Sequence, residues 1–160
     1  MRKTFNALDI SKGVITSRVS HGDICIDATA GRGNDTAFLC ELVGERGKVT
    51  AFDIQSDAIE STRKLLCEKG LSDRANLVLG SHTDMDKYAD EGTIACITFN
   101  FGWLPGGDHT VHTNKDTSLE AVKKALRLIK KGGLISMILY YGRDTGFEEK
   151  DALLEFVKTV

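Results

Sequence analysis

The sequence predicts an α/β fold in which helices cover both faces of a parallel β-sheet. Short apolar runs of strand length alternate along the chain with longer segments of helical periodicity. The strand-like runs are almost continuously apolar, as expected for strands that are buried on both faces. The 16 glycines and one proline suit regular elements joined by glycine turns. Because parallel crossovers are right-handed, the expected arrangement is a doubly wound sheet.

The expected elements alternate from the first helix to the last. The first helix, over residues 5–19, spaces its apolar side chains to pack on the sheet. Expected strands cover residues 24–29, 48–53, 76–80, 93–100 and 134–141, and expected helices cover 36–43, 56–69, 118–131 and 148–160. No sixth strand is expected after the last helix. Such an ending is compatible with a complete α/β domain and with a shortened chain.

Composition places limits on the class of protein. A chain of 160 residues, 41% hydrophobic and 28% charged, is expected to form one domain over residues 1–160. The charged N-terminus predicts neither a signal peptide nor a membrane span. The four cysteines fall inside expected strands and helices without a Cys-x-x-Cys pair, so we expect buried thiols in the reducing cytoplasm. The net charge of -2 means that any contact with RNA has to come from local patches.

A glycine loop follows the first expected strand. Gly31 and Gly33 allow a tight turn and the close approach of a ligand to the backbone. A dinucleotide-binding loop would have a third glycine at the position of Thr36. The carboxylates of Asp27 and Asp35 would lie beside the pyrophosphate of such a ligand, and they suit a cation better. The α-amino group and the sulfonium of S-adenosylmethionine are such cations.

Asp53 ends the second expected strand, about twenty residues beyond the glycines. A carboxylate at this place can accept hydrogen bonds from both hydroxyls of a ribose. NAD-binding proteins share the feature, but the chain is short for a dehydrogenase with a substrate domain. The alternative is that the loop is an ordinary strand-to-helix turn. We therefore expect a Rossmann-like sheet with S-adenosylmethionine as its cofactor.

Four segments together resemble one family: residues 27–36, 51–55, 80–82 and 100–108. The chain resembles the small bacterial class I methyltransferases catalogued as rRNA methylases, whose characterised members are similar to tRNA wobble-uridine methyltransferases. The resemblance covers essentially the whole chain, and Leu-Pro-Gly-Gly-Asp at 104–108 is its most specific part. It implies N-methylation of the 5-aminomethyl group of 2-thiouridine at the wobble position. Family chains continue into an antiparallel strand pair that this sequence lacks.

The resemblance also implies which side chains contact each part of the cofactor. By position, it assigns the methionine end to Arg32, Asn34 and Asp35, the ribose to Asp53 and Gln55, and the adenine side to Ser81 and His82.

Asn100 ends the fourth expected strand, at the edge where open α/β sheets bind their ligands. It resembles the Asn or Asp with which amino-methyltransferases accept a hydrogen bond from the target amine. Such a bond positions the nitrogen, and positioning supplies most of the catalysis of an in-line displacement. An alkylamine must also lose a proton, which Asp108, His109 or Tyr141 could accept. The alternative for Asn100 is a hydrogen bond within a turn.

The remaining candidates concern the substrate. Trp103, between glycines, could stack on a splayed base or belong to the core. His109 and His112 lack a third histidine or a cysteine, so we expect no metal site. Basic residues, Lys123 and Arg127 among them, form a stripe on the expected helix 118–131. The stripe consists of Lys123, Lys124, Arg127, Lys130 and Lys131, and a second cluster consists of Arg2, Lys3, Lys12 and Arg18.

These clusters are either solvated faces or contacts to RNA phosphates. We expect RNA, and most of all tRNA, as the partner; we expect no membrane and leave a homodimer open. The alternatives to a tRNA methyltransferase are an rRNA or small-molecule methyltransferase and a non-catalytic module that binds S-adenosylmethionine.

Overall fold

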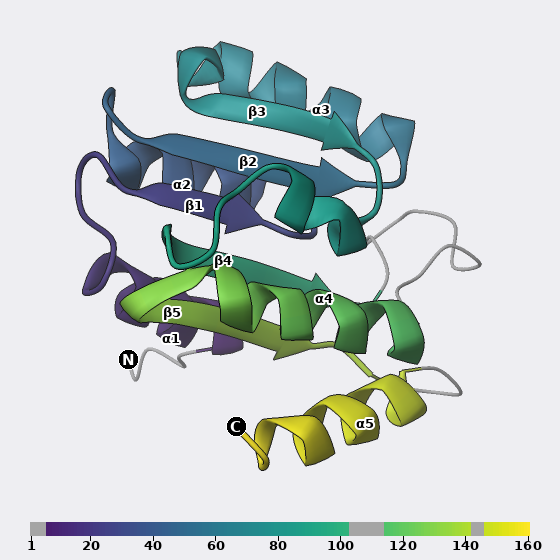
Figure 1. The fold of residues 1–160 in the computed structure, drawn as a ribbon. Coiled ribbons are helices and arrows are strands. Elements are labelled where there is room, and N and C mark those ends of the chain that lie inside the picture. The colour runs from purple at the N-terminus through teal and green to yellow at the C-terminus, as the bar shows by residue number, and fades with distance from the viewer. Residues whose placement is uncertain (1–5, 103–113, 142–145) are drawn as a thin grey trace, which may run out of the picture.

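The computed structural model describes residues 6–102, 114–141 and 146–160. Figure 1 shows strands that run side by side with helices packed over them. The helices are α1 (Ala7–Thr16), α2 (Asn34–Val43), α3 (Ser56–Glu68), α4 (Lys115–Leu128) and α5 (Phe147–Val157), with the short 3-10 helices η1 (Ser72–Arg74) and η2 (His82–Lys87). The strands are β1 (Ile24–Asp27), β2 (Lys48–Asp53), β3 (Ala75–Leu79), β4 (Ile94–Phe101) and β5 (Ile129–Leu139).

The sheet has the strand order β3-β2-β1-β4-β5, and every neighbouring pair is parallel. The order reverses between β1 and β4, because the chain first builds outward through β2 and β3 and then returns to the other side of β1. The loops that leave β1 and β4 therefore diverge at the carboxyl edge of the sheet. Open α/β sheets bind ligands at such a switch point.

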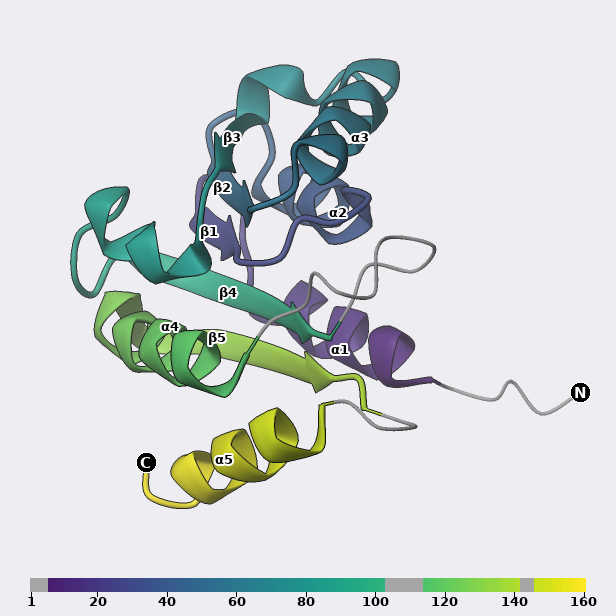
Figure 2. The same cartoon turned by 90° about the vertical axis from the view of Figure 1, so that its right-hand side faces the viewer.

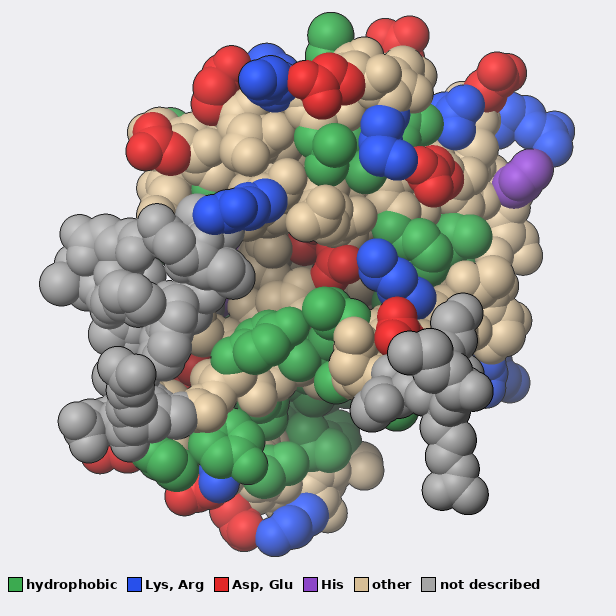
Figure 3. Space-filling model, turned by 180° about the vertical axis from the view of Figure 1, so that it is seen from behind, with side chains coloured by type: hydrophobic (Ala, Val, Ile, Leu, Met, Phe, Trp, Pro, Cys, Tyr) green, Lys and Arg blue, Asp and Glu red, His purple; other side chains and the backbone are tan. Residues whose placement is uncertain are grey.

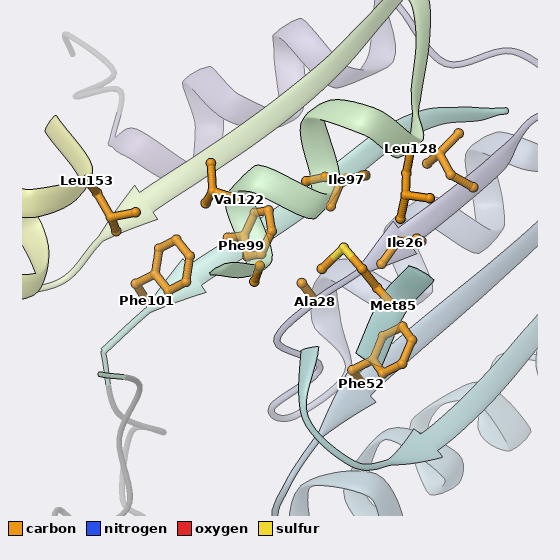
Figure 4. Packing of buried hydrophobic residues seen from close by; sticks show 13 residues of the cluster. Ile26, Ala28, Phe52, Met85, Ile97, Phe99, Phe101, Val122, Leu128 and Leu153 are labelled. Atoms are coloured by element: carbon orange, nitrogen blue, oxygen red, sulfur yellow. The ribbon is translucent and has the colours of Figure 1, made fainter. Parts of the chain in front are cut away.

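Helices cover both faces of the sheet. Figure 2 shows α1, α2 and α3 on one face and α4 on the other, with α5 beyond the β5 edge of the sheet. Each face has its own apolar core, with Cys25, Leu39 and Val49 in the first and aromatic and aliphatic side chains in the second. Figure 4 shows the second core, in which Phe99 and Phe101 of β4 face α4 and α5. The doubly wound parallel sheet expected from the sequence is confirmed.

The expected boundary between the fourth helix and the fifth strand is wrong. α4 begins at Lys115, where Asn114 caps it by accepting hydrogen bonds from two backbone N–H groups, and it ends at Leu128. β5 begins at once with Ile129, five residues earlier than expected. Gly132, which directly follows the expected helix 118–131, has φ 77° and lies within β5, where the pairing with β4 shifts register. Lys130 and Lys131 therefore lie on a strand and not on the expected helix.

The other elements differ less from expectation. The first helix is shorter than the expected 5–19 and starts from a capping box in which Asn6 and Asp9 bond each other's backbone N–H. The two 3-10 helices have no counterpart among the expected elements. None of the described helices is long and apolar enough to cross a membrane.

A groove of about 650 Å³ runs along β5 on the side away from β4. Its lining comes from α1, β5 and α5 and is mostly apolar, with Ile10, Val14 and Leu154 among its residues. Figure 3, which views the molecule from behind, shows hydrophobic side chains gathered in the lower half of this face. Among the described residues, β5 pairs with β4 alone.

Candidate active site at the carboxyl edge of the sheet

The glycine loop between β1 and α2 packs directly against α3. Gly31 and Gly33 have φ 56° and φ 85°, in the left-handed region that favours glycine. A Cβ atom at Gly33 would lie 2.8 Å from the Cα of Thr62, so a side chain at this position would push α3 away. The buried Thr62 hydroxyl donates a hydrogen bond to the carbonyl of Gly31 at 3.2 Å. The loop is therefore shaped by its own glycines and by one turn of α3.

Asp53 joins this loop to the end of β2. Its Oδ2 accepts a hydrogen bond from the N–H of Gly31 at 2.9 Å, and its Oδ1 accepts one from the N–H of Gln55 at 3.0 Å. Each carboxylate oxygen can accept a further bond, so a ribose hydroxyl can be added without breaking these. The structure thus brings together three residues predicted to bind the nucleoside part of a cofactor.

Asp27 is fully buried at the end of β1. It accepts a hydrogen bond from the Thr36 hydroxyl at 2.6 Å and one from the N–H of Thr29 at 3.1 Å. Burial raises the pKa of Asp27 to about 7; the bond from Thr36 opposes the shift, and the negative charge of Asp35 adds to it. A positive ligand nearby would favour the ionised form of this carboxyl. The site therefore suits a cation electrostatically, as the sequence predicts.

Asn100 lies near the end of β4, across the switch point from the glycine loop. Its backbone N–H donates to the Thr29 hydroxyl at 2.7 Å, and its Nδ2 donates to Oδ2 of Asp35 at 2.6 Å. Its Oδ1 is buried and has no hydrogen-bond partner. The structure thus brings Asn100 and Asp35 together, and it leaves Oδ1 of Asn100 as a buried acceptor without a partner near the end of β4.

Ser81 and His82 follow β3 at the same edge. Ser81 caps the start of η2, because its side chain accepts a hydrogen bond from the N–H of Thr83. The His82 ring is buried, with Nδ1 at 3.3 Å from the carbonyl oxygen of Ala28, and it packs edge-on against the rings of Phe99 and Phe101. Burial lowers the pKa of His82. The ring therefore belongs to the core beneath the loop, and its predicted contact with adenine stays a prediction.

The candidate proton acceptors are not all within the described part of the chain. Asp108 and His109 lie outside the described residues, as do Trp103 and His112. Tyr141 is exposed, and its ring packs against Phe147 of α5, with the ring centroids 5.5 Å apart. Its role as a proton acceptor stays a prediction. The described residues hold no group of three His, Cys, Asp or Glu side chains arranged for a metal ion.

Tyr140, the neighbour of Tyr141, is not among the candidates from the sequence. Burial raises its pKa, and the negative charge of Asp35 raises it further. A Cβ atom at Gly102 would lie only 2.9 Å from the Cβ of Tyr140, so the ends of β4 and β5 are in close contact. The hydroxyl of Tyr140 is thus affected by the negative charge of the site.

The predicted basic stripe does not form as one surface. Arg127 lies 3.7 Å from Glu91 and 3.9 Å from Asp86, measured between side-chain nitrogen and oxygen atoms. Its carbonyl accepts a hydrogen bond from Gly92, which precedes β4, so Arg127 lies near the amino edge of the sheet. Lys123 places its ammonium over a ring of α5 at 5.7 Å. Arg127 thus lies at the opposite edge of the sheet from Asn100, and contact of either residue with the substrate stays a prediction.

Three threonines of the site escape prediction from the sequence. Thr36 does give a signal, since it stands where a dinucleotide loop has its third glycine, yet this signal does not predict its bond to Asp27. Thr29 and Thr62 give none, because each acts on a segment distant in sequence. Such contacts depend on how the strands are ordered, which no local pattern encodes.

The residues present fit S-adenosylmethionine. The absence of a Cβ at Gly33 lets the loop pack closely against Thr62 of α3, and Asp53 retains acceptor capacity for a ribose. The buried carboxyl of Asp27 and its neighbour Asp35 provide negative charge for a cation. The unpaired Oδ1 of Asn100 is a hydrogen-bond acceptor for a substrate bound beside the cofactor.

Comparison with known proteins agrees with this assignment. A family model described as "Putative rRNA methylase" matches residues 49–160. A curated relative, "tRNA (mnm(5)s(2)U34)-methyltransferase, chloroplastic" of Arabidopsis thaliana, is 38% identical over 94% of this chain. The chain spans 58% of the length of that relative.

Two solved structures are similar over 99% of this chain. The first, a "putative rRNA-methylase" from Clostridium thermocellum, is 47% identical with a TM-score of 0.95, and 85% of it is covered. The second, a "putative methyltransferase" from Streptococcus mutans in complex with SAH, is 36% identical with a TM-score of 0.88, and 84% of it is covered. The chain therefore belongs to the "Putative rRNA methylase" family and has the Rossmann-like fold of class I methyltransferases.

Proposed function

We propose that this chain is an S-adenosylmethionine-dependent methyltransferase that acts on RNA. Its proposed substrate is the 5-aminomethyl group of 2-thiouridine at the tRNA wobble position, and its product is 5-methylaminomethyl-2-thiouridine. The observation that carries the proposal is the buried, unpaired Oδ1 of Asn100 beside the glycine loop. The name of the Arabidopsis relative supports the choice of nucleoside.

The glycine loop and its neighbours would hold the cofactor. Asp53 and Gln55 would contact the ribose, and Ser81 and His82 would lie on the adenine side. Arg32, Asn34 and Asp35, at the start of α2, would line the methionine end. When bound, S-adenosylmethionine supplies a methyl group carried on a positively charged sulfur.

The chain's own residues position the amine and the proton that it loses. Asn100 Oδ1 accepts a hydrogen bond from the amine, so that the nitrogen lone pair points away from Asn100 toward the methyl carbon. The new nitrogen–carbon bond forms as the carbon–sulfur bond breaks, and that electron pair stays on sulfur. The nitrogen gives up one proton, for which Asp108, His109 and Tyr141 remain our candidates.

Labelled methyl transfer tests this function. The protein is incubated with labelled S-adenosylmethionine and, separately, with tRNA lacking the methyl group, with rRNA and with small amines, and the nucleosides are then analysed. We expect the label in 5-methylaminomethyl-2-thiouridine of tRNA. Label found only in rRNA or in a small amine, or no transfer at all, would overturn the proposed substrate.

Asn100→Ala tests the observation that carries the proposal. We expect its kcat to fall by about 100-fold, because the amine is no longer positioned by a hydrogen bond. Asn76→Ala on β3, an exposed position away from the site, is the matched control and should keep wild-type activity. Wild-type activity in the Asn100 variant would remove the basis of the mechanism. A cytoplasmic location and a homodimer stay predictions from the sequence.

A further inference from the structure

The carboxamide of Asn100 has a specific orientation. Its Nδ2 donates to Oδ2 of Asp35 at 2.6 Å, and its Oδ1 is buried without a partner. The backbone of the same residue is fixed by the bond from its N–H to the Thr29 hydroxyl at 2.7 Å. A buried acceptor without a partner costs free energy, so this orientation needs a physical cause.

Asp35 supplies that cause. A carboxamide can turn over and exchange the places of its oxygen and its NH2 group, with little change in shape. An ionised carboxylate only accepts hydrogen bonds, so it pairs with the NH2 group and not with the oxygen. Asp35 lies in the first turn of α2, where the peptide dipoles favour a negative charge. Its presence therefore holds Nδ2 toward α2 and directs Oδ1 of Asn100 the other way.

We propose, building on the function above, that Asp35 is a positioning residue that selects the acceptor orientation of Asn100 for the target nitrogen. In this orientation the site recognises a reacting atom that carries a hydrogen, as a neutral amine does. In the opposite orientation the NH2 group of Asn100 would face the amine and compete for its lone pair. The carboxylate acts through Asn100 and need not touch the amine.

An exchange of the two side chains tests this role. Asp35→Asn leaves the orientation of Asn100 unselected, and Asn100→Asp places two carboxylates against each other. In the double variant Asp35→Asn/Asn100→Asp, the new amide can donate to the new carboxylate, whose other oxygen remains an acceptor for the amine. All of these side chains have nearly the same shape, so packing is preserved. Asp57→Asn, an exposed acid in the first turn of α3, is the matched control.

We expect Asp35→Asn to lower kcat by about 10- to 100-fold, with KM for tRNA changed by less than about twofold. The kcat of the double variant should be at least about tenfold higher than that of Asp35→Asn, although it contains both substitutions. Asp57→Asn should behave as wild type. If the double variant is as slow as the product of the two single effects, the proposed coupling is wrong. Unfolding midpoints measured for each variant show whether a loss of activity is a loss of folding.

A second measurement does not depend on activity. The side-chain amide signals of Asn100 in ¹⁵N-labelled protein should shift in Asp35→Asn and stay in place in Asp57→Asn. Unmoved signals in Asp35→Asn would overturn the proposal even if kcat falls. If wild-type protein methylates no tRNA, the proposed function is wrong, but the role of Asp35 is not yet decided. The amide signals then still decide whether Asp35 orients Asn100, and kcat is measured on whichever substrate accepts the label.

Discussion

Three carboxylates act differently at the site because their surroundings differ. Asp27 is buried and bonded by two threonines, Asp53 is bonded by two backbone N–H groups, and Asp35 pairs with the amide of Asn100. Burial of Asp27 raises its pKa to about 7, close to physiological pH. The charge of Asp27 therefore changes close to physiological pH.

Binding of the methyl donor should strengthen as pH rises through about 7. A cation binds better to the ionised form of Asp27, and that form becomes dominant only above its raised pKa. We expect affinity for S-adenosylmethionine, measured by calorimetry, to be about five- to tenfold higher at pH 8 than at pH 6. Asp27→Asn should flatten this dependence and show only the titration of the ligand itself. An unchanged pH dependence in the variant would place the titrating group elsewhere.

The same shift predicts how stability depends on pH. The folded state binds the proton of Asp27 more tightly than the unfolded state does, because its folded pKa lies above the ordinary value of 3.8. The stabilisation from this residue is thus present at low pH and is lost as pH rises from about 4 to about 7. Urea unfolding between pH 4 and pH 8 should show this slope in the wild type and a smaller slope in Asp27→Asn. Equal slopes in the two proteins would contradict the assignment.

At the level of elements, the glycine loop and α3 are fitted to each other. The absent side chain of Gly33 allows Thr62 to approach, and the Thr62 hydroxyl then bonds the loop. α4 and α5 are joined differently, through the bond of 2.5 Å from the buried Ser118 hydroxyl to the buried Glu149 carboxylate. The apolar side chain of Leu153 belongs to the second core, which α4 and α5 share.

Gly33→Ala should disturb both stability and cofactor binding. The new Cβ would lie 2.8 Å from the Cα of Thr62, and the backbone also has a positive φ. We expect unfolding to become easier by about 2 to 3 kcal/mol in urea titrations. Gly70→Ala is the control, since its φ is also positive, at 67°, and open space surrounds it; it should cost about 1 kcal/mol. Equal costs for the two variants would show that the packing against α3 is unimportant.

Ser118→Ala should loosen α5 from α4. Its hydroxyl is the hydrogen-bond donor to Glu149, so the variant leaves a buried carboxylate without this partner, at a cost of about 1 to 3 kcal/mol. The matched control is Thr117→Ala, which removes a neighbouring hydroxyl whose bond, to the carbonyl of Asn114, is exposed. Thermal unfolding should show a larger loss for the first variant. The reverse order would mean that the buried bond contributes little.

The sequence predicts those elements best whose signals are local. The second strand has the predicted bounds, Lys48–Asp53, because an apolar run and its flanking turns define it. The start of β5 differs from the prediction, since the glycine pair at 132–133 is a helix stop signal that here lies in an irregular stretch of strand. At the site, the glycine loop is a local signal, and it predicts the class of cofactor that the relatives share. The pairing of Asp35 with Asn100 is not predictable in this way, because 65 residues separate them.

For the molecule as a whole, the sheet has one edge strand with unusual surroundings. β5 pairs with β4 on one side, and along its other side the apolar groove lies between α1 and α5. Acidic side chains accompany the cations of α4, so the protein does not present a single basic face there. Its net charge of -2 agrees with this distribution. The proposed binding of RNA would therefore rely on a few local contacts.

The α4 cations should affect tRNA binding and not the chemical step. We expect Lys123→Gln/Arg127→Gln to raise KM for tRNA by about twofold at low salt while kcat stays unchanged. Acidic partners already satisfy part of the Arg127 charge, so the effect is small. The slope of log affinity against log salt should fall by at most about 0.9 for each phosphate that the variant no longer neutralises. Lys64→Gln on α3 is the control, and a fall in kcat without a change in KM would contradict the expectation.

The bond between Asn100 and Thr29 joins residues 71 positions apart, across the adjacent strands β1 and β4. Contacts of such long range are slow to form, because the intervening chain must first be ordered. During synthesis the glycine loop, β2 and β3 emerge before β4, and the place of β4 beside β1 has to stay open until that strand arrives. A nascent chain can thus complete the glycine loop, the proposed nucleoside site, well before it contains Asn100, the proposed contact of the amine. The bond between Thr29 and Asn100 can therefore form only after the glycine loop, β2 and β3 have been made.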